Sequence, residues 1–320
     1  AEGARLLAIG IEGLIALAAA RALTADESKR IGVGAAIGAA LGAGLLLFEW
    51  ASGAALAHWI HGWDPRVIVS DTRYDRGATT VVLIVWPAAL ALRRWRILQI
   101  VIAAAIGLSV FVMTSAASLL AFVAGIVSFA IALRAPRVVA GALAATVIAG
   151  AALLPVAVPT YQTTVQIQHD APWIKPSGIH RLLIWRFAAE RIADRPLLGW
   201  GMDASRDLPG GKRDFGTTLP GIELGSGLDA MPLHPHDALL QWRLELGIPG
   251  TILCLAIVVW ALRRVGWRFN GSREAQAISL GWAATVTVIA LLSFGIWQEW
   301  WLSIILLTAS LIAASAIDAA

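Results

Sequence analysis

The strongest constraint on this chain is a series of nine long apolar segments. They cover approximately residues 5–23, 31–56, 78–92, 97–113, 116–133, 138–158, 238–262, 276–295 and 300–317. A helix needs roughly 20 apolar residues to cross the hydrocarbon core of a bilayer. Because 58% of the residues are apolar and only 14% are charged, a soluble chain could not hide this surface. The sequence predicts an all-α polytopic integral membrane protein with about nine transmembrane helices, and it excludes a cytosolic enzyme or a nucleic-acid binder.

The positions of the basic residues predict an orientation. Lys and Arg gather in four short loops, near residues 21–30, 93–96, 134–137 and 263–273. Such loops favour the cytoplasmic side, so alternation places residues 159–237 and residue 1 outside and the C-terminus inside. Since the chain begins with Ala on the outer side, we expect an odd number of preceding spans. Three more would give twelve.

The predicted organisation has three parts. Residues 1–158 carry six membrane helices, residues 159–237 form a periplasmic loop subdomain, and residues 238–320 carry three more membrane helices. The middle part is too long and too rich in charge for a simple connector. The net charge of +4, which in a soluble chain would suggest nucleic acid, is explained here by the loop arginines.

Three glycines, Gly34, Gly38 and Gly42, fall on one face of the predicted helix 31–56. A dinucleotide-binding turn is disfavoured because no strand precedes them. We expect a helix-packing face of small residues instead.

The outer subdomain contains a predicted amphipathic helix over Ser177–Asp194, preceded by Pro176. Its expected apolar stripe has spacings of three, four and three, and consists of Leu182, Trp185, Ala189 and Ile192. Arg181 and Arg186 flank this stripe, and Glu190 is placed to pair with Arg186. Arginines here bind either lipid headgroups or a ligand phosphate, and the flanking positions favour a ligand phosphate.

A His-Pro-His-Asp run at residues 234–237 directly precedes the seventh predicted span, and all six histidines fall in outer segments. Three interpretations are open. A zinc site would need a third ligand from His180 or His169. A histidine at the interface without chemistry is the simplest interpretation. A general base is favoured, because neutral imidazole is well suited to take a hydroxyl proton near pH 7.

Three motifs, in this order along the chain, together resemble the O-antigen ligase and polymerase superfamily. They are Asp75–Gly77 at the start of a span that reaches Trp86-Pro87, Arg181–Trp185 with Asp194–Gly201, and His236-Asp237 followed after nine residues by Gly247–Gly250. The resemblance covers about residues 70–260. Asp237 departs from the family pattern, which usually has Asn, Ser or Gln there.

The resemblance implies a GT-C-like glycosyltransferase that moves O-antigen glycan from undecaprenyl diphosphate to lipid A-core. The transfer takes place on the periplasmic face of the bacterial inner membrane, without a metal or other cofactor. In this interpretation His236 is the catalytic base, and the diphosphate ligands are Arg76, Arg181 and Arg186. Supporting positions are His234, Asp237, Trp185 and His180.

Other functions stay open. Within the same class are an O-antigen polymerase and a protein O-oligosaccharyltransferase, although the spacing after His236 favours the ligase. A lipid or anion transporter predicts ionisable residues inside spans, and few are present, namely Glu12, Glu49, Arg243 and Glu245. A structural subunit would have no need for His236.

Overall fold

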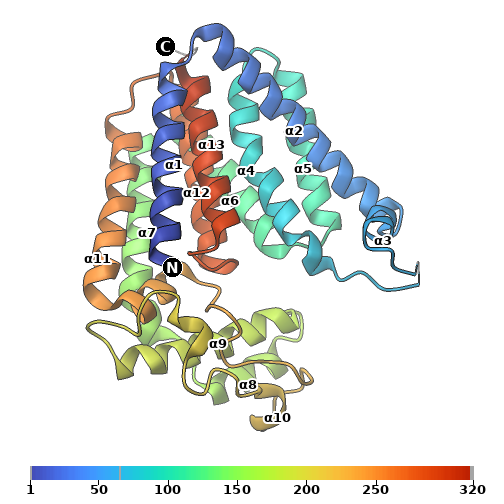
Figure 1. The fold of residues 1–320 in the computed structure, drawn as a ribbon, viewed down its shortest axis with the longest axis vertical. Coiled ribbons are helices and arrows are strands. Elements are labelled where there is room, and N and C mark those ends of the chain that lie inside the picture. The colour runs from blue at the N-terminus through green and yellow to red at the C-terminus, as the bar shows by residue number, and fades with distance from the viewer. Residues whose placement is uncertain (1, 65, 318–320) are drawn as a thin grey trace. The chain divides into compact units, whose positions relative to one another are not determined.

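The computed structural model describes residues 2–64 and 66–317, and helices dominate it (Figure 1). Each of the nine predicted spans is a helix. They are α1 (Glu2–Ala22), α2 (Ala25–Ala51), α4 (Asp75–Ala91), α5 (Arg96–Val112), α6 (Ala116–Ala132), α7 (Pro136–Ala157), α11 (Ala238–Trp267), α12 (Arg273–Leu292) and α13 (Glu299–Ile317). Within the described ranges, six of them are long and apolar enough to cross a membrane. The other three, α4, α5 and α6, have 17 residues each. The prediction of a polytopic all-α membrane protein is confirmed.

The ends of α2 differ from the predicted segment 31–56. The helix begins six residues earlier, because Thr24 and Glu27 form a reciprocal capping box around the first turn. It ends five residues earlier, because Gly53 and Ala54 adopt positive φ angles of 64° and 68°. The polar residues that resembled a loop in the sequence therefore form the first helical turn.

The chain divides into two compact units, and the second consists of Leu6–Gly141, Leu262–Ile289 and Glu299–Ala320. In this unit α2, α4, α5 and α13 pack against one another (Figure 1). The predicted glycine face is confirmed in part. A Cβ on Gly42 would lie 2.7 Å from Val81 of α4, and one on Gly38 would lie 3.6 Å from Ile84, whereas Gly34 faces open space.

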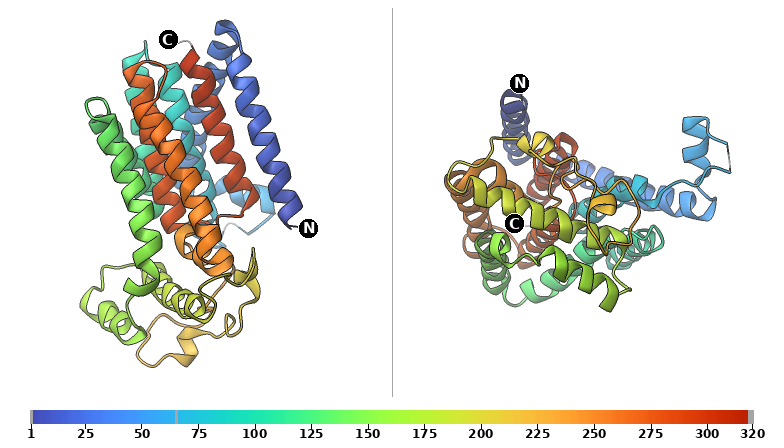
Figure 2. Two further views of the ribbon diagram at one scale, coloured as in Figure 1. Left: turned by 90° about the vertical axis from the view of Figure 1, so that its left-hand side faces the viewer. Right: turned by 90° about the horizontal axis from the view of Figure 1, so that it is seen from below.

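The first unit consists of Ala1–Arg5, Ala142–Ala261 and Ala290–Gln298. Its outer part holds α8 (Tyr161–Asp170), α9 (Pro176–Asp194), η2 (Ala204–Asp207) and α10 (Phe215–Thr218). The α8 and α9 helices lie side by side (Figure 2). The Gly-rich segment after them is anchored rather than free, because Phe215 and Met231 are fully buried in the same core.

The α9 helix has the predicted extent but a different buried face. The buried side chains are Ile179, Leu183, Ile184, Phe187, Ala188, Ala189 and Ile192. Leu182 and Trp185, which the expected stripe included, are only half-buried. The expected stripe was therefore wrong in half of its members, because Trp185 uses its indole N–H for a hydrogen bond to another segment.

The α11 helix is broken at Gly247, which has φ 63° and ψ −159°. The break frees two carbonyl groups, and the turn after α9 satisfies them. Trp200 N donates to Leu244 O and Gly201 N donates to Glu245 O, both at 2.9 Å, while Ile248 N donates to Leu197 O at 3.0 Å. Buried backbone groups need such partners, so the two motifs at 194–201 and 247–250 complete each other's hydrogen bonds.

Candidate functional site

His236 lies two residues before the start of α11. It has a positive φ of 58°, a conformation that is uncommon for a residue other than glycine. Its ring Nδ1 is 2.5 Å from the backbone carbonyl oxygen of Ser293. Because a carbonyl only accepts, Nδ1 carries the proton in the neutral ring, and Nε2 keeps its lone pair. Within the described residues, no hydrogen-bond partner meets Nε2. The backbone thus holds the ring in the tautomer that a general base at Nε2 requires.

The surroundings of His236 keep its ring neutral. Burial lowers its pKa from 6.5 to about 4, and the positive charge of Arg181 acts in the same direction. The hydrogen bond to the Ser293 carbonyl raises the pKa and opposes these effects only in part. At neutral pH the imidazole is therefore uncharged and able to accept a proton.

His234 differs from its neighbour. It is 7% exposed, and both ring nitrogens face N–H donors. The backbone N of His236 is 3.1 Å from Nδ1, and the backbone N of Gly295 is 3.2 Å from Nε2. A neutral ring carries one N–H, so only one of its two nitrogens accepts a hydrogen bond from these donors. A protonated ring would turn an N–H toward both donors, and burial already lowers the pKa of His234 to about 3. This ring has no nitrogen free for a substrate, so it fits a structural role beside His236.

Asp237 caps α11. Its Oδ1 accepts from the backbone N of Leu240 at 2.8 Å, and the residue is 2% exposed. Burial raises the pKa of the carboxyl to about 7, although backbone N–H groups of Leu239 and Leu240 act to lower it. In the described part of the chain, this side chain bonds to the start of the helix and to neither histidine ring.

The α9 helix places two arginines differently. The charge of Arg181 lowers the pKa of both His234 and His236, so this arginine is close enough to the histidine pair to act on it electrostatically. Arg186 forms the predicted pair with Glu190, with Nε 3.0 Å from Oε1. Of the two, Arg181 is the one that lies with the candidate base.

The neighbours of Arg181 on α9 hold the same segment. The indole N–H of Trp185 donates to the carbonyl of Pro235 at 2.8 Å, which fixes the backbone between the two histidines. His180 Nε2 bonds to the carbonyl oxygen of Asp229 at 3.0 Å. The structure thus gathers His180, Arg181, Trp185, His234, His236 and Asp237 in one unit.

Arg76 stands at the start of α4 in the second unit, with its guanidinium 5.4 Å from the ring centre of Trp300. Its place in the site stays a prediction.

The sequence patterns predicted no role for the segment between α12 and α13, or for Glu245, the carboxylate that holds it. Glu245, 1% exposed, accepts hydrogen bonds from several donors. They are Asp203 N at 2.8 Å, Ser205 Oγ at 2.5 Å, Gln241 Nε2 at 3.0 Å and Trp297 Nε1 at 2.5 Å. Gln241 Oε1 in turn accepts from Ile296 N at 2.9 Å. An ionisable residue in a predicted span was the available signal.

Sequence analysis also gave no role to Arg206 of η2. Its positive charge lowers the pKa of His234, and its guanidinium Nε is 2.9 Å from the carboxylate of Asp203. Two arginines from different segments, Arg181 of α9 and Arg206 of η2, thus lower the pKa of His234.

The comparisons with known proteins indicate a family for this chain. A family model described as O-antigen ligase matches residues 101–255. A Rickettsia conorii protein named "Putative polysaccharide ligase RC0486" is 30% identical over 236 residues, which are 72% of this chain and 54% of that protein. A Rickettsia felis protein with a similar name is 30% identical over 233 residues, 72% of this chain and 55% of its own. The chain thus spans about half the length of these relatives. No solved structure matches it significantly.

Proposed function

Because this chain belongs to an O-antigen ligase-like family of multi-pass membrane proteins, we propose that it acts in polysaccharide transfer. The glycan passes from undecaprenyl diphosphate to a hydroxyl of lipid A-core. The reaction takes place on the periplasmic face of the bacterial inner membrane. The observation that carries this proposal is the bond between His236 Nδ1 and the Ser293 carbonyl, because it leaves Nε2 as a base.

In the proposed step, the acceptor oxygen attacks the anomeric carbon of the glycan. Its proton goes to Nε2 of His236 as the bond between the anomeric carbon and the diphosphate oxygen breaks. Attack opposite the leaving group inverts the anomeric centre. The leaving diphosphate is already a good leaving group, so a base and a cation suffice for the chemistry.

Arg181 is the proposed cation for the developing charge on the diphosphate, since its charge acts on the candidate base His236. Arg76 and Arg186 are proposed as further ligands. A diphosphate bound at Arg181 would offset the charge that lowers the pKa of His236. Substrate binding would therefore raise the basicity of the ring when the base is needed.

The test is transfer in vitro with the purified full-length protein, undecaprenyl-diphosphate-linked glycan and lipid A-core. We expect His236→Gln to lose transfer and His169→Gln, on an exposed part of α8, to keep it. Equal product from both variants would overturn the proposal. A ladder of lengthened lipid-linked glycan would instead indicate a polymerase, and NMR of the new linkage would show whether the centre inverts.

A further inference from the structure

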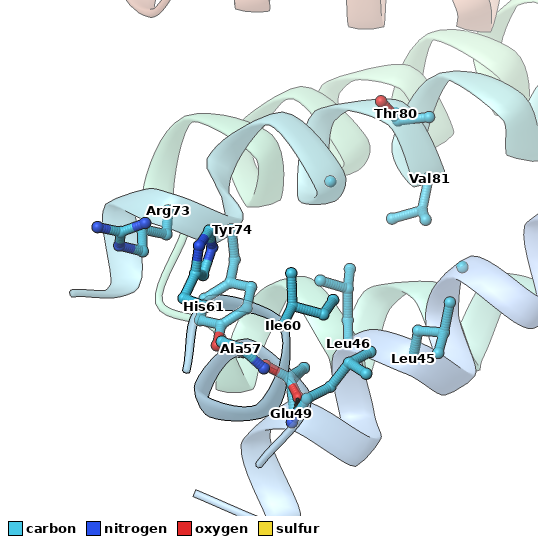
Figure 3. A pocket seen from close by; sticks show the side chains of 13 residues that line it. Leu45, Leu46, Glu49, Ala57, Ile60, His61, Arg73, Tyr74, Thr80 and Val81 are labelled. Atoms are coloured by element: carbon cyan, nitrogen blue, oxygen red, sulfur yellow. Dashed lines mark hydrogen bonds between the residues drawn. The ribbon is translucent and has the colours of Figure 1, made fainter. Parts of the chain in front are cut away.

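A second candidate binding site lies in the second unit, whereas the histidine pair belongs to the first. It is a groove of about 490 Å³ between α2, α3 (Ala55–His61), η1 (Asp71–Tyr74) and α4. Its walls are mostly apolar side chains, including Leu45, Leu46, Ile60 and Val81 (Figure 3). Since α2 is long and apolar enough to cross a membrane, this groove opens among helices that meet lipid.

The two ends of the groove differ in polarity. Figure 3 shows Arg73, His61 and Tyr74 grouped at one end, and Leu45 and Val81 at the other. An amphiphile with one polar and one apolar end has the same distribution. A ligand that was apolar throughout would leave the cationic end without a partner.

Aromatic rings hold the cation at the polar end in place. The Arg73 guanidinium carbon lies 4.2 Å from the ring centre of Trp63, which stacks on His61 at 4.5 Å. Among the described side chains, no carboxylate lies within ion-pair distance of Arg73. A positioned guanidinium with its edge open suits a phosphate group.

The lining includes a carboxylate, Glu49, and its hydrogen bonds turn it away from a ligand. It is 6% exposed and accepts from Leu56 N at 2.7 Å, Ala57 N at 3.2 Å and the hydroxyl of Tyr74 at 2.7 Å. These bonds tie the end of α2 to α3 and η1. The carboxylate thus builds the groove, and both of its oxygens are engaged by hydrogen bonds within the chain.

We propose that this groove binds an anionic phospholipid of the surrounding bilayer, with one acyl chain along the apolar wall and the phosphate at Arg73. The neighbouring Trp59 and Ile60 of α3 are 79% and 61% exposed, as expected for side chains at a membrane interface. The proposal is independent of the transfer reaction. The bound lipid would fix α3 and η1 against α2 and α4.

The experiment uses the full-length protein in nanodiscs that contain phosphatidylglycerol with a photoreactive diazirine in one acyl chain. We expect crosslinks on α2, α3 and α4 around Leu45, Ile60 and Val81. Arg73→Gln, which removes the charge, should lower them about tenfold, as the loss of one charge-assisted contact implies. Ala57→Phe, which fills the groove, should also remove them. The matched control is Arg66→Gln, an exposed arginine of the same outer segment.

Each outcome decides the proposal. Crosslinks that are equal in all variants, or equal with phosphatidylcholine as the labelled lipid, would overturn it. Crosslinks that added undecaprenyl phosphate displaces but excess phosphatidylglycerol does not would overturn the assignment to a phospholipid. Thermal unfolding of each variant checks that a lost crosslink does not reflect a lost fold.

Discussion

The carbonyl oxygen of Ser293 lies 2.5 Å from Nδ1 of His236, although 57 residues separate the two in the chain. This contact determines which ring nitrogen is basic, and it comes from backbone that follows α12. A base that is oriented by backbone does not need an acidic partner. Asp237, the adjacent carboxylate, is accordingly free to cap α11.

Replacing His236 tests the base directly. His236→Gln keeps a donor for the Ser293 carbonyl but removes the basic nitrogen. We expect kcat to fall by about 10²–10⁴, the usual contribution of a general base, with little change in KM or in thermal unfolding. A variant that transfers glycan at the unchanged rate would contradict the assigned role.

Replacing Arg181 tests its link to the base. Because the charge of Arg181 lowers the pKa of His236, Arg181→Gln should raise that pKa. The acid limb of the profile of kcat/KM against pH should then move to higher pH. Arg186→Gln is the contrast, because Arg186 pairs with Glu190, and its acid limb should stay in place. If the acid limbs of the two pH profiles were identical in the wild type and in Arg181→Gln, Arg181 would not influence the pKa of the base.

The sequence predicted the elements far better than the contacts between them. Apolar length located nine helices because the bilayer imposes that length on every crossing. The proline before α9 and the spacing of its charged residues predicted this helix and the ion pair between Arg186 and Glu190. The break between the predicted segments 97–113 and 116–133 was also located correctly, since α5 ends at Val112 and α6 begins at Ala116.

The contacts that the sequence did not predict are those with backbone that is distant along the chain. No local pattern indicates that Ser293 would meet His236, or that Glu245 would hold Trp297 and Ser205. The break in α11 was missed for the same reason. An apolar run that contains Gly247 predicts a continuous helix unless the turn that completes its hydrogen bonds is known.

The break in α11 predicts a strong effect of a single methyl group. In Gly247→Ala the new Cβ would overlap the carbonyl of Leu197 at a positive φ. We expect a loss of roughly 1–3 kcal/mol of stability from the strained backbone, and more from the overlap. Thermal unfolding measures it. Gly34→Ala, which faces open space within α2, should be neutral or stabilising, and equal melting of both variants would argue against the interlocked turns.

Glu245→Gln tests the carboxylate that joins three segments. A glutamine keeps one acceptor oxygen but turns an NH2 group toward donors such as Trp297 and Ser205. Leaving buried donors unpaired costs about 1–3 kcal/mol. We expect lower thermal stability and a lower kcat, because the segment that contacts His234 would loosen. Glu223→Gln, at an exposed position, is the control. If the turnover of Glu245→Gln were unchanged, this carboxylate would contribute to the stability of the fold and not to catalysis.

Stability should depend on pH through the residues around the base. The pKa values of His234 and His236 are about 3 and 4 in the folded chain, below the ordinary 6.5. The unfolded chain therefore binds more protons below pH 6.5, and stability falls as pH drops from there toward 4, by at most about 1.4 kcal/mol per pH unit for each ring. Asp237 acts oppositely, because its pKa is raised from 3.8 to about 7. Its contribution is lost as pH rises through that range.

The pKa shifts of the two histidines and of Asp237 have opposite directions, so replacing one kind of group should change the pH dependence of stability in the opposite way to replacing the other. Between pH 4 and 6.5, two histidines outweigh one carboxyl, so the unfolding free energy of the wild type should rise with pH. His236→Gln removes a histidine and should flatten that slope, whereas Asp237→Asn removes the opposing group and should steepen it. Urea unfolding in detergent at a series of pH values measures all three. Slopes that change in the same direction in both variants would show that these groups do not have the opposed shifts from which the prediction follows.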